Sequence, residues 1–170
     1  SKKPTTLMED AAIKGFYNIA NRHFKGYKEL YICEGDSAVG ALNNCRNAKY
    51  QALYGIRGVT DNVFDMNVAQ LMECDVFRNL VTILGCGIGK DFDPKKLRYR
   101  KIIICTDSDS DGRNITSLLL NFFINFMPEL IEMGVIYKAM PPLYLLDGKT
   151  GKKFYTGPNF LYDKRELYQI

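Results

Sequence analysis

The fold is decided by the stretch Lys101-Ile-Ile-Ile-Cys-Thr-Asp-Ser-Asp-Ser-Asp-Gly112. Its first half is continuously apolar and rich in β-branched residues, which is typical of a central strand buried on both faces of a parallel sheet. Its second half alternates aspartate with serine and ends in glycine, which indicates a turn. The apolar spacing beyond that turn predicts a long helix from Ile115 to about Phe126.

An earlier stretch shows the same order of elements. Glu29-Leu-Tyr-Ile-Cys33 is a short apolar run that stops at Glu34-Gly-Asp-Ser37. Asp36 and Ser37 are residues that commonly cap helix N-termini, and residues 38–47 can form the helix that follows. This stretch therefore predicts a strand, a tight turn and a helix.

The other elements follow from apolar spacing and from the positions of glycine and proline. They are a helix over residues 7–24, a strand over 50–56, one or two helices over 68–84, a short helix over 128–134, a strand over 135–140, and a hairpin formed by 143–146 and 153–156. Strands that alternate with helices predict an α/β fold. Its sheet is mainly parallel and flanked by helices, with a short C-terminal hairpin extension.

Composition narrows the class of protein. With 170 residues, of which 46% are hydrophobic, the chain can bury one core. No apolar run approaches the ~20 residues needed to span a bilayer, and the N-terminal stretch does not resemble a secretory signal, so we expect an intracellular protein. The five cysteines lack any CxxC pairing, which argues against a zinc site or a disulfide framework. The net charge of +4 is compatible with a polyanionic partner.

Four carboxylates stand just beyond two of the predicted strands: Glu34, Asp107, Asp109 and Asp111. Sites in open parallel sheets lie at the carboxyl ends of the strands. If the two strands are neighbours, these carboxylates converge, and their mutual repulsion calls for a cation. Oxygen ligands with room for water and phosphate favour one or two Mg²⁺ ions, for which Mn²⁺ or Ca²⁺ can substitute. Phosphate chemistry is therefore the leading interpretation.

The aspartates admit three other interpretations. An EF-hand needs a glutamate at loop position 12, where this chain has Leu118, and a helix before the loop. The strand and DxD start resemble a haloacid-dehalogenase-like phosphatase, but that family has threonine or valine in place of Asp111. Capping of the following helix explains one aspartate better than three.

The two acidic turns resemble those of the TOPRIM domain of topoisomerases, primases and some nucleases. Further segments narrow the resemblance to B-type subunits of type II topoisomerases, across roughly residues 5–157. These segments are Tyr31-Ile-Cys-Glu-Gly-Asp-Ser-Ala38, Cys45-Arg-Asn-Ala-Lys49, Leu84-Gly-Cys-Gly-Ile-Gly89, Lys96-Leu-Arg-Tyr99 and Pro141-Pro-Leu-Tyr144.

The resemblance implies a TOPRIM (Rossmann-like) domain over residues 29–142, preceded by a helical lead-in (1–28) and followed by a hairpin or helical extension (143–170), as part of a larger protein. It implies an ATP-dependent type II topoisomerase that cuts and rejoins double-stranded DNA, with this domain inactive in isolation. The nucleophilic tyrosine would come from an A-type subunit or region, and ATP would bind N-terminal to Ser1. The expected location is the cytoplasm at the nucleoid, or the host cytoplasm for a phage protein, with no membrane partner.

The resemblance also assigns roles to residues. Glu34 would be a metal ligand and a general acid or base, Asp107 and Asp109 principal ligands, and Asp111 an accessory ligand. Arg57 would assist catalysis. The expected DNA contacts are Ser37, Arg46, Lys49, Arg57 and Arg113.

Three departures from the family pattern accompany the match. Gly55-Ile-Arg-Gly-Val59 replaces P-L-[RK]-G-K, Arg113-Asn114 replaces S-H, and Val39 replaces a small residue. These differences hint at a phage or otherwise divergent enzyme. Another TOPRIM enzyme, such as a primase or nuclease, and a non-catalytic DNA-binding or assembly module are the alternative functions.

Overall fold

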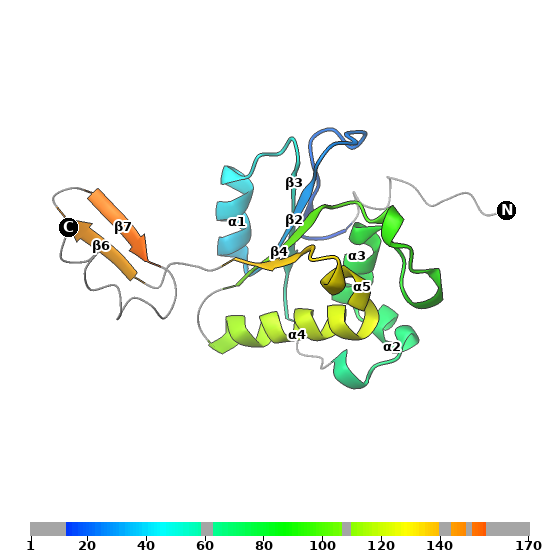
Figure 1. Ribbon diagram of the computed structural model, residues 1–170. Helices are drawn as coiled ribbons and strands as arrows, with labels where there is room; N and C mark the ends of the chain where they lie inside the picture. The colour runs from blue at the N-terminus through cyan, green and yellow to red at the C-terminus, as the bar shows by residue number, and fades with distance from the viewer. Residues whose placement is uncertain (1–12, 59–62, 107–109, 140–143, 149–150, 156–170) are drawn as a thin grey trace.

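The computed structural model describes residues 13–58, 63–106, 110–139, 144–148 and 151–155. Its main sheet has the strand order β1-β3-β2-β4-β5 (Figure 1). All neighbouring pairs are parallel except β1 with β3. The strands are β1 (Phe16–Tyr17), β2 (Glu29–Glu34), β3 (Gln51–Ile56), β4 (Lys101–Cys105) and β5 (Ile136–Lys138). The predicted α/β fold with a mainly parallel sheet is confirmed.

Helices connect these strands. They are α1 (Asp36–Cys45), α2 (Val68–Glu73), α3 (Asp75–Leu84), α4 (Ser110–Phe126) and α5 (Pro128–Glu132). Short 3₁₀ turns lie at η2 (Val63–Asp65), η3 (Gly89–Asp91) and η4 (Pro94–Lys96). A separate hairpin pairs β6 (Tyr144–Gly148) with β7 (Gly151–Tyr155), as predicted. Among the described residues, no helix combines the length and apolarity needed to cross a membrane.

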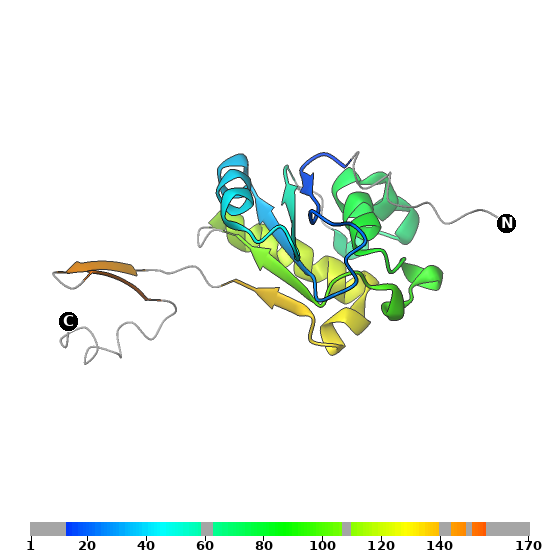
Figure 2. The same cartoon turned by 90° about the horizontal axis from the view of Figure 1, so that it is seen from above.

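The core lies on the face of the sheet that is covered by α3, α4 and α5, while α1 covers part of the opposite face (Figures 1 and 2). Ile32 and Ile104 belong to this core and are fully buried. Phe77 of α3 stacks on Phe122 of α4 with ring centroids 5.1 Å apart. Burying one such aromatic side chain stabilises the fold by roughly 1.5–3 kcal/mol.

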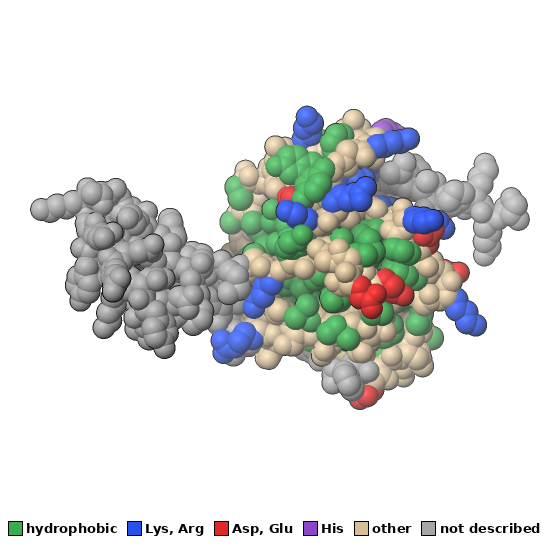
Figure 3. All heavy atoms as spheres, in the orientation of Figure 1, with side chains coloured by type: hydrophobic (Ala, Val, Ile, Leu, Met, Phe, Trp, Pro, Cys, Tyr) green, Lys and Arg blue, Asp and Glu red, His purple; other side chains and the backbone are tan. Residues whose placement is uncertain are grey.

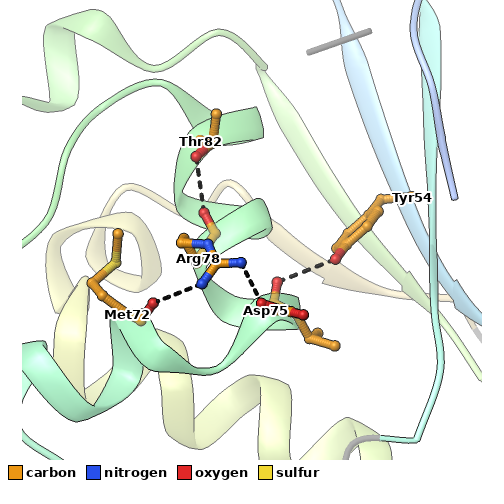
Figure 4. Close-up of polar contacts among 6 residues, drawn as sticks. Tyr54, Met72, Asp75, Arg78 and Thr82 are labelled. Carbon is orange, nitrogen blue, oxygen red and sulfur yellow. Dashed lines mark hydrogen bonds and ion pairs between the residues drawn. The ribbon is translucent and has the colours of Figure 1, made fainter. Parts of the chain in front are cut away.

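Polar contacts join α2 to α3, and one hydrogen bond joins α3 to the sheet (Figure 4). The Tyr54 hydroxyl of β3 donates to the Val76 carbonyl at 3.2 Å. Arg78 of α3 donates to the Met72 carbonyl of α2 at 3.2 Å and forms an ion pair with Asp75. Because Tyr54 is almost fully buried, its hydrogen bond satisfies a hydroxyl that would otherwise destabilise the core.

The prediction of a helix over residues 7–24 is wrong for its described part, residues 13–24. Gly15 adopts φ 81°, and its carbonyl accepts a hydrogen bond from Gly55 N at 2.9 Å. Phe16 then pairs with Tyr54 as a short antiparallel strand. Phe16 and Ile19 pack against the core, as the apolar spacing suggested. They reach it from turns and a short strand, not from one face of a helix. The proposed boundaries of the lead-in and the extension stay predictions.

Two smaller expectations also need correction. The helix after the aspartates begins at Ser110, not Ile115, so Asp111 lies in its first turn, where a negative charge complements the helix dipole. In β4, Ile102 and Ile104 are buried, but Ile103 and Cys105 are only half-buried. The strand is therefore interior to the sheet and fully covered on one face only.

Candidate metal centre

The carboxyl edge of the sheet places Glu34 beside Thr106, the residue that precedes the aspartates in the sequence. β2 and β4 are adjacent and parallel, with Cys33 opposite Cys105, so Glu34 lies beside Thr106. On its other side, Glu34 pairs with Ile56, the residue before Arg57. The condition set for convergence of the carboxylates, that the two strands are neighbours, is met. Thr106 is the last described residue before Asp107.

The turn after Glu34 depends on glycine. Gly35 adopts φ 82° and is the N-cap of α1, with no side-chain capping bond. Because a positive φ is strained for residues with a Cβ, glycine allows the helix to begin directly after the strand. Asp36 and Ser37, predicted as caps, instead occupy the first turn of α1. Ser37 is therefore exposed at the same edge as Glu34.

Arg57 is held at this edge by an ion pair with Asp36. Their side chains are 64% and 67% exposed, so the pair contributes at most about 1 kcal/mol to stability. Such a weak contact can be exchanged for a contact with a phosphate. The guanidinium of Arg57 thus lies beside the turn that follows Glu34, and its ion pair with Asp36 is weak.

Both ends of the acidic turn are anchored by a pair of buried threonines. Thr106 and Thr116 are 8% and 6% exposed, and their hydroxyls lie 2.8 Å apart. Thr116 donates its proton to the Gly112 carbonyl at 2.8 Å, so Thr106 is the donor to Thr116. The end of β4 is thereby joined to the first turns of α4. Asp111 is exposed on the first of these turns.

This threonine pair has a measurable consequence. Thr116→Val keeps the side-chain shape but leaves the buried Thr106 hydroxyl without its acceptor, so we expect the free energy of unfolding to fall by about 1–3 kcal/mol. Urea denaturation followed by circular dichroism measures this loss. The matched control is Ser117→Ala, which removes an exposed hydroxyl bonded to the Arg113 carbonyl and should change stability by less than about 0.5 kcal/mol. If both variants lost the same free energy of unfolding, the hydrogen bond between Thr106 and Thr116 would not be the source of the stability.

The donor atoms at this edge suit a hard cation. Of the four predicted ligands, Glu34 and Asp111 are described, while Asp107 and Asp109 lie outside the described residues. Both described ligands offer carboxylate oxygens, which are the donors that Mg²⁺ prefers. Within the part of the chain that the structure describes, no three acidic, cysteine or histidine side chains form a metal cluster.

Two predicted DNA contacts lie elsewhere. α1 runs back across the sheet, so Arg46 and Lys49 lie at the opposite edge, where β3 begins. The Arg46 guanidinium donates to the carbonyls of Asn18 and Gln51 at 3.1 and 2.5 Å. These bonds give Arg46 a role in joining α1 to the sheet. Of the predicted DNA contacts, Ser37, Arg57 and Arg113 remain at or near the carboxyl edge.

Residues 29–137 match the model of the Toprim domain family. Relatives include the B subunit of the type 2 topoisomerase of Aquifex aeolicus, 48% identical over 74% of this chain and 16% of that protein. The DNA gyrase B subunit of Archaeoglobus fulgidus is 44% identical over 84% of this chain and 22% of its own length, and that of Campylobacter jejuni is 47% identical over 75% and 16%. The chain thus spans about a fifth of these relatives. With its mainly parallel sheet and a family match over residues 29–137, this chain belongs to the Toprim domain family.

Proposed function

We propose that this chain is the metal-binding part of the DNA cleavage and rejoining centre of an ATP-dependent type II topoisomerase. The observation that carries the proposal is the parallel pairing of β2 with β4, which sets Glu34 beside the strand end that leads into Asp107. The similarity to the B subunits of type II topoisomerases supports it. That similarity also favours this function over a primase, a nuclease or a non-catalytic module.

In this proposal Glu34, Asp107 and Asp109 hold Mg²⁺, with Asp111 as an accessory ligand. A bound Mg²⁺ ion would stabilise negative charge on the attacking and leaving oxygens of a phosphoryl transfer. Glu34 accepts or returns the proton at the reacting oxygen. Arg57, Ser37 and Arg113 contact the neighbouring phosphates, and the contacts predicted for Arg46 and Lys49 stay untested.

The nucleophile is a tyrosine of an A-type partner. Its oxygen forms a bond to phosphorus while the bond from phosphorus to the sugar oxygen breaks, and the reverse step rejoins the strand. Water takes no part in this exchange, so no phosphodiester bond is hydrolysed. The proposal further includes an ATPase region in the same polypeptide, double-stranded DNA as substrate, and a cytoplasmic location.

The metal site can be tested on this chain alone. We expect it to bind Mn²⁺ in an electron paramagnetic resonance titration, and we expect Glu34→Gln combined with Asp107→Asn to weaken that binding at least about tenfold, because two charged ligands become neutral. Asp91→Asn, which removes an exposed carboxylate of η3, is the matched control and should leave binding within about twofold. Unchanged Mn²⁺ binding by the double variant would refute the assignment.

A further inference from the structure

A second charged feature lies at the amino edge of the sheet, where β2, β4 and β5 begin. The loop before β2, the segment before β4 and the turn before β5 enclose a groove of about 650 Å³. Five of its lining residues are cationic: Lys25, Lys28, Lys95, Arg98 and Arg100. In Figure 3, Lys and Arg side chains gather in the upper half of the face shown.

The groove has a strong excess of positive charge. Among the described residues that line it, none is aspartate or glutamate. Within the described part of the chain, no ion pair joins a carboxylate to Lys25, Lys28, Lys95 or Arg100. Partial burial, followed by the charge of Arg98, lowers the pKa of Lys28. Clustered cations that repel one another bind an anion favourably, because the anion offsets their repulsion.

Hydrogen bonds from main-chain amides hold the segments that carry these cations. Arg100 N donates to the Lys28 carbonyl at 2.8 Å, which joins the two main walls of the groove. Arg98 N donates to the Leu84 carbonyl at 3.1 Å, and Lys95 N donates to Asp93 Oδ1 at 3.0 Å. The groove is therefore formed before any ligand binds, which lowers the entropy lost on binding.

This groove is separate from the carboxyl edge. The six residues of β2 lie between them, and at ~3.3 Å per residue this strand spans roughly 17–20 Å. A phosphate in the groove therefore cannot be the one beside Glu34. Lys25, Lys95 and Arg100 are exposed and come from two loops, so they can contact successive phosphates of a chain that runs along the surface.

We propose that the groove at the amino edge binds the sugar–phosphate backbone of a DNA segment other than the one beside Glu34. Long, exposed Lys and Arg side chains suit sequence-independent contacts with a phosphate backbone. The carboxylates of the opposite edge take no part in this contact. The existence of a separate DNA segment beside Glu34 rests on the proposed function, but binding at the groove needs no divalent metal, so a failure of the metal site would leave binding at the groove unchanged.

The test is fluorescence anisotropy of the full 170-residue chain with a labelled duplex of about 20 base pairs, in EDTA and over a range of salt concentrations. The groove variant is Lys95→Gln with Arg100→Gln. The matched control is Lys90→Gln with Lys96→Gln, which removes two charges from the same region but outside the groove, since Lys96 faces Asp93 at 3.9 Å. Circular dichroism checks that both variants are folded.

We expect the groove variant to bind DNA at least about tenfold more weakly, with a salt slope reduced by about 2, because each phosphate contact contributes ~0.9 to that slope. The control should stay within about threefold of the unmodified chain. Equal losses in both variants would overturn the proposal, because net charge alone would then explain binding. Unchanged DNA binding by the groove variant would overturn it too, as would a groove-dependent affinity for inorganic pyrophosphate that DNA does not displace.

Discussion

Under the proposed function, Glu34→Gln is expected to slow Mg²⁺-dependent DNA cleavage by at least about 100-fold when the chain works within the proposed B-type subunit and with the proposed tyrosine-bearing partner. Glutamine keeps the size of the side chain at the end of β2 but cannot take up a proton from the attacking oxygen. It also offers one neutral oxygen to a cation in place of a charged carboxylate. The measurement is the single-turnover rate of cleavage of a labelled duplex.

The matched control for this prediction is Glu29→Gln, at the other end of the same strand. Glu29 accepts hydrogen bonds from Tyr27 and Gln51 at 2.8 and 2.9 Å, far from the carboxyl edge. We expect cleavage by this variant to stay within about threefold of the unmodified protein. If Glu34→Gln cleaved DNA within about threefold of the unmodified rate, Glu34 would have no part in the chemistry. The same conclusion would follow if both variants lost the same fraction of the cleavage rate.

Gly55→Ala is expected to lower the free energy of unfolding by about 1–3 kcal/mol, the usual range for overpacking. A Cβ at Gly55 of β3 would overlap Val39 Cγ2 of α1. Gly55 also sits between α1 and the Gly15 carbonyl that accepts its N–H, which limits movement of the strand. Thermal or urea unfolding of the chain measures the change.

A double-mutant cycle tests the physical reason. Val39→Ala removes the overlapping methyl groups and leaves Val39 Cβ at an ordinary 3.6 Å from the new Cβ. The double variant should therefore recover most of the loss, with a coupling energy of about 1–2 kcal/mol. Gly40→Ala, in the same helix with open space around it, should be neutral or stabilising. If the losses of unfolding free energy from Val39→Ala and Gly55→Ala simply added, the two side chains would not be in direct contact.

This contact relates two departures from the family pattern that look independent in the sequence. Val39 stands where the pattern has a small residue, and Gly55 stands where it has proline. The structure brings the two positions together, so the Val39 side chain occupies the space that Gly55 leaves by having no side chain. Sequence alone could not predict this pairing, because the residues belong to different elements, α1 and β3.

Prediction from sequence succeeded where apolar runs were short and bounded by clear turns. The strands over residues 29–34, 51–56 and 101–105 were found because each is rich in buried apolar residues and ends at glycine or an acidic turn. Their parallel arrangement follows from the helices between them. The neighbouring positions of β2 and β4 meet the condition on which the predicted metal site depends, and they place Glu34 beside Thr106.

Prediction failed where tertiary contacts overrode local spacing. Residues 13–24 have apolar positions at helical intervals, but pairing with the edge of β3 holds Phe16 and Tyr17 extended. The DNA contacts expected at Arg46 and Lys49 rest mostly on the family resemblance and stay predictions, although the fold separates these residues from Glu34. Because α1 crosses the sheet from one edge to the other, residues that follow it lie far from that glutamate.

The Thr106–Thr116 pair was also missed, although both residues flank the acidic turn. Buried hydroxyls at a strand end and on a helix ten residues later give no periodic signal. A useful indication would have been their polarity within otherwise apolar positions, since Thr106 ends the strand and Thr116 follows Ile115 on the buried side of α4. Such residues must find hydrogen-bond partners when they are buried.

The most direct measurement of the central claim is the capture of a covalent protein–DNA adduct. The proposed B-type subunit and the proposed tyrosine-bearing partner would be mixed with labelled duplex DNA, denatured rapidly, and separated by gel electrophoresis with and without Mg²⁺. We predict an adduct on the partner's tyrosine that requires both this Toprim chain and Mg²⁺, and that disappears when the strands are allowed to rejoin. Cleavage that leaves free DNA ends with no protein attached would contradict the account.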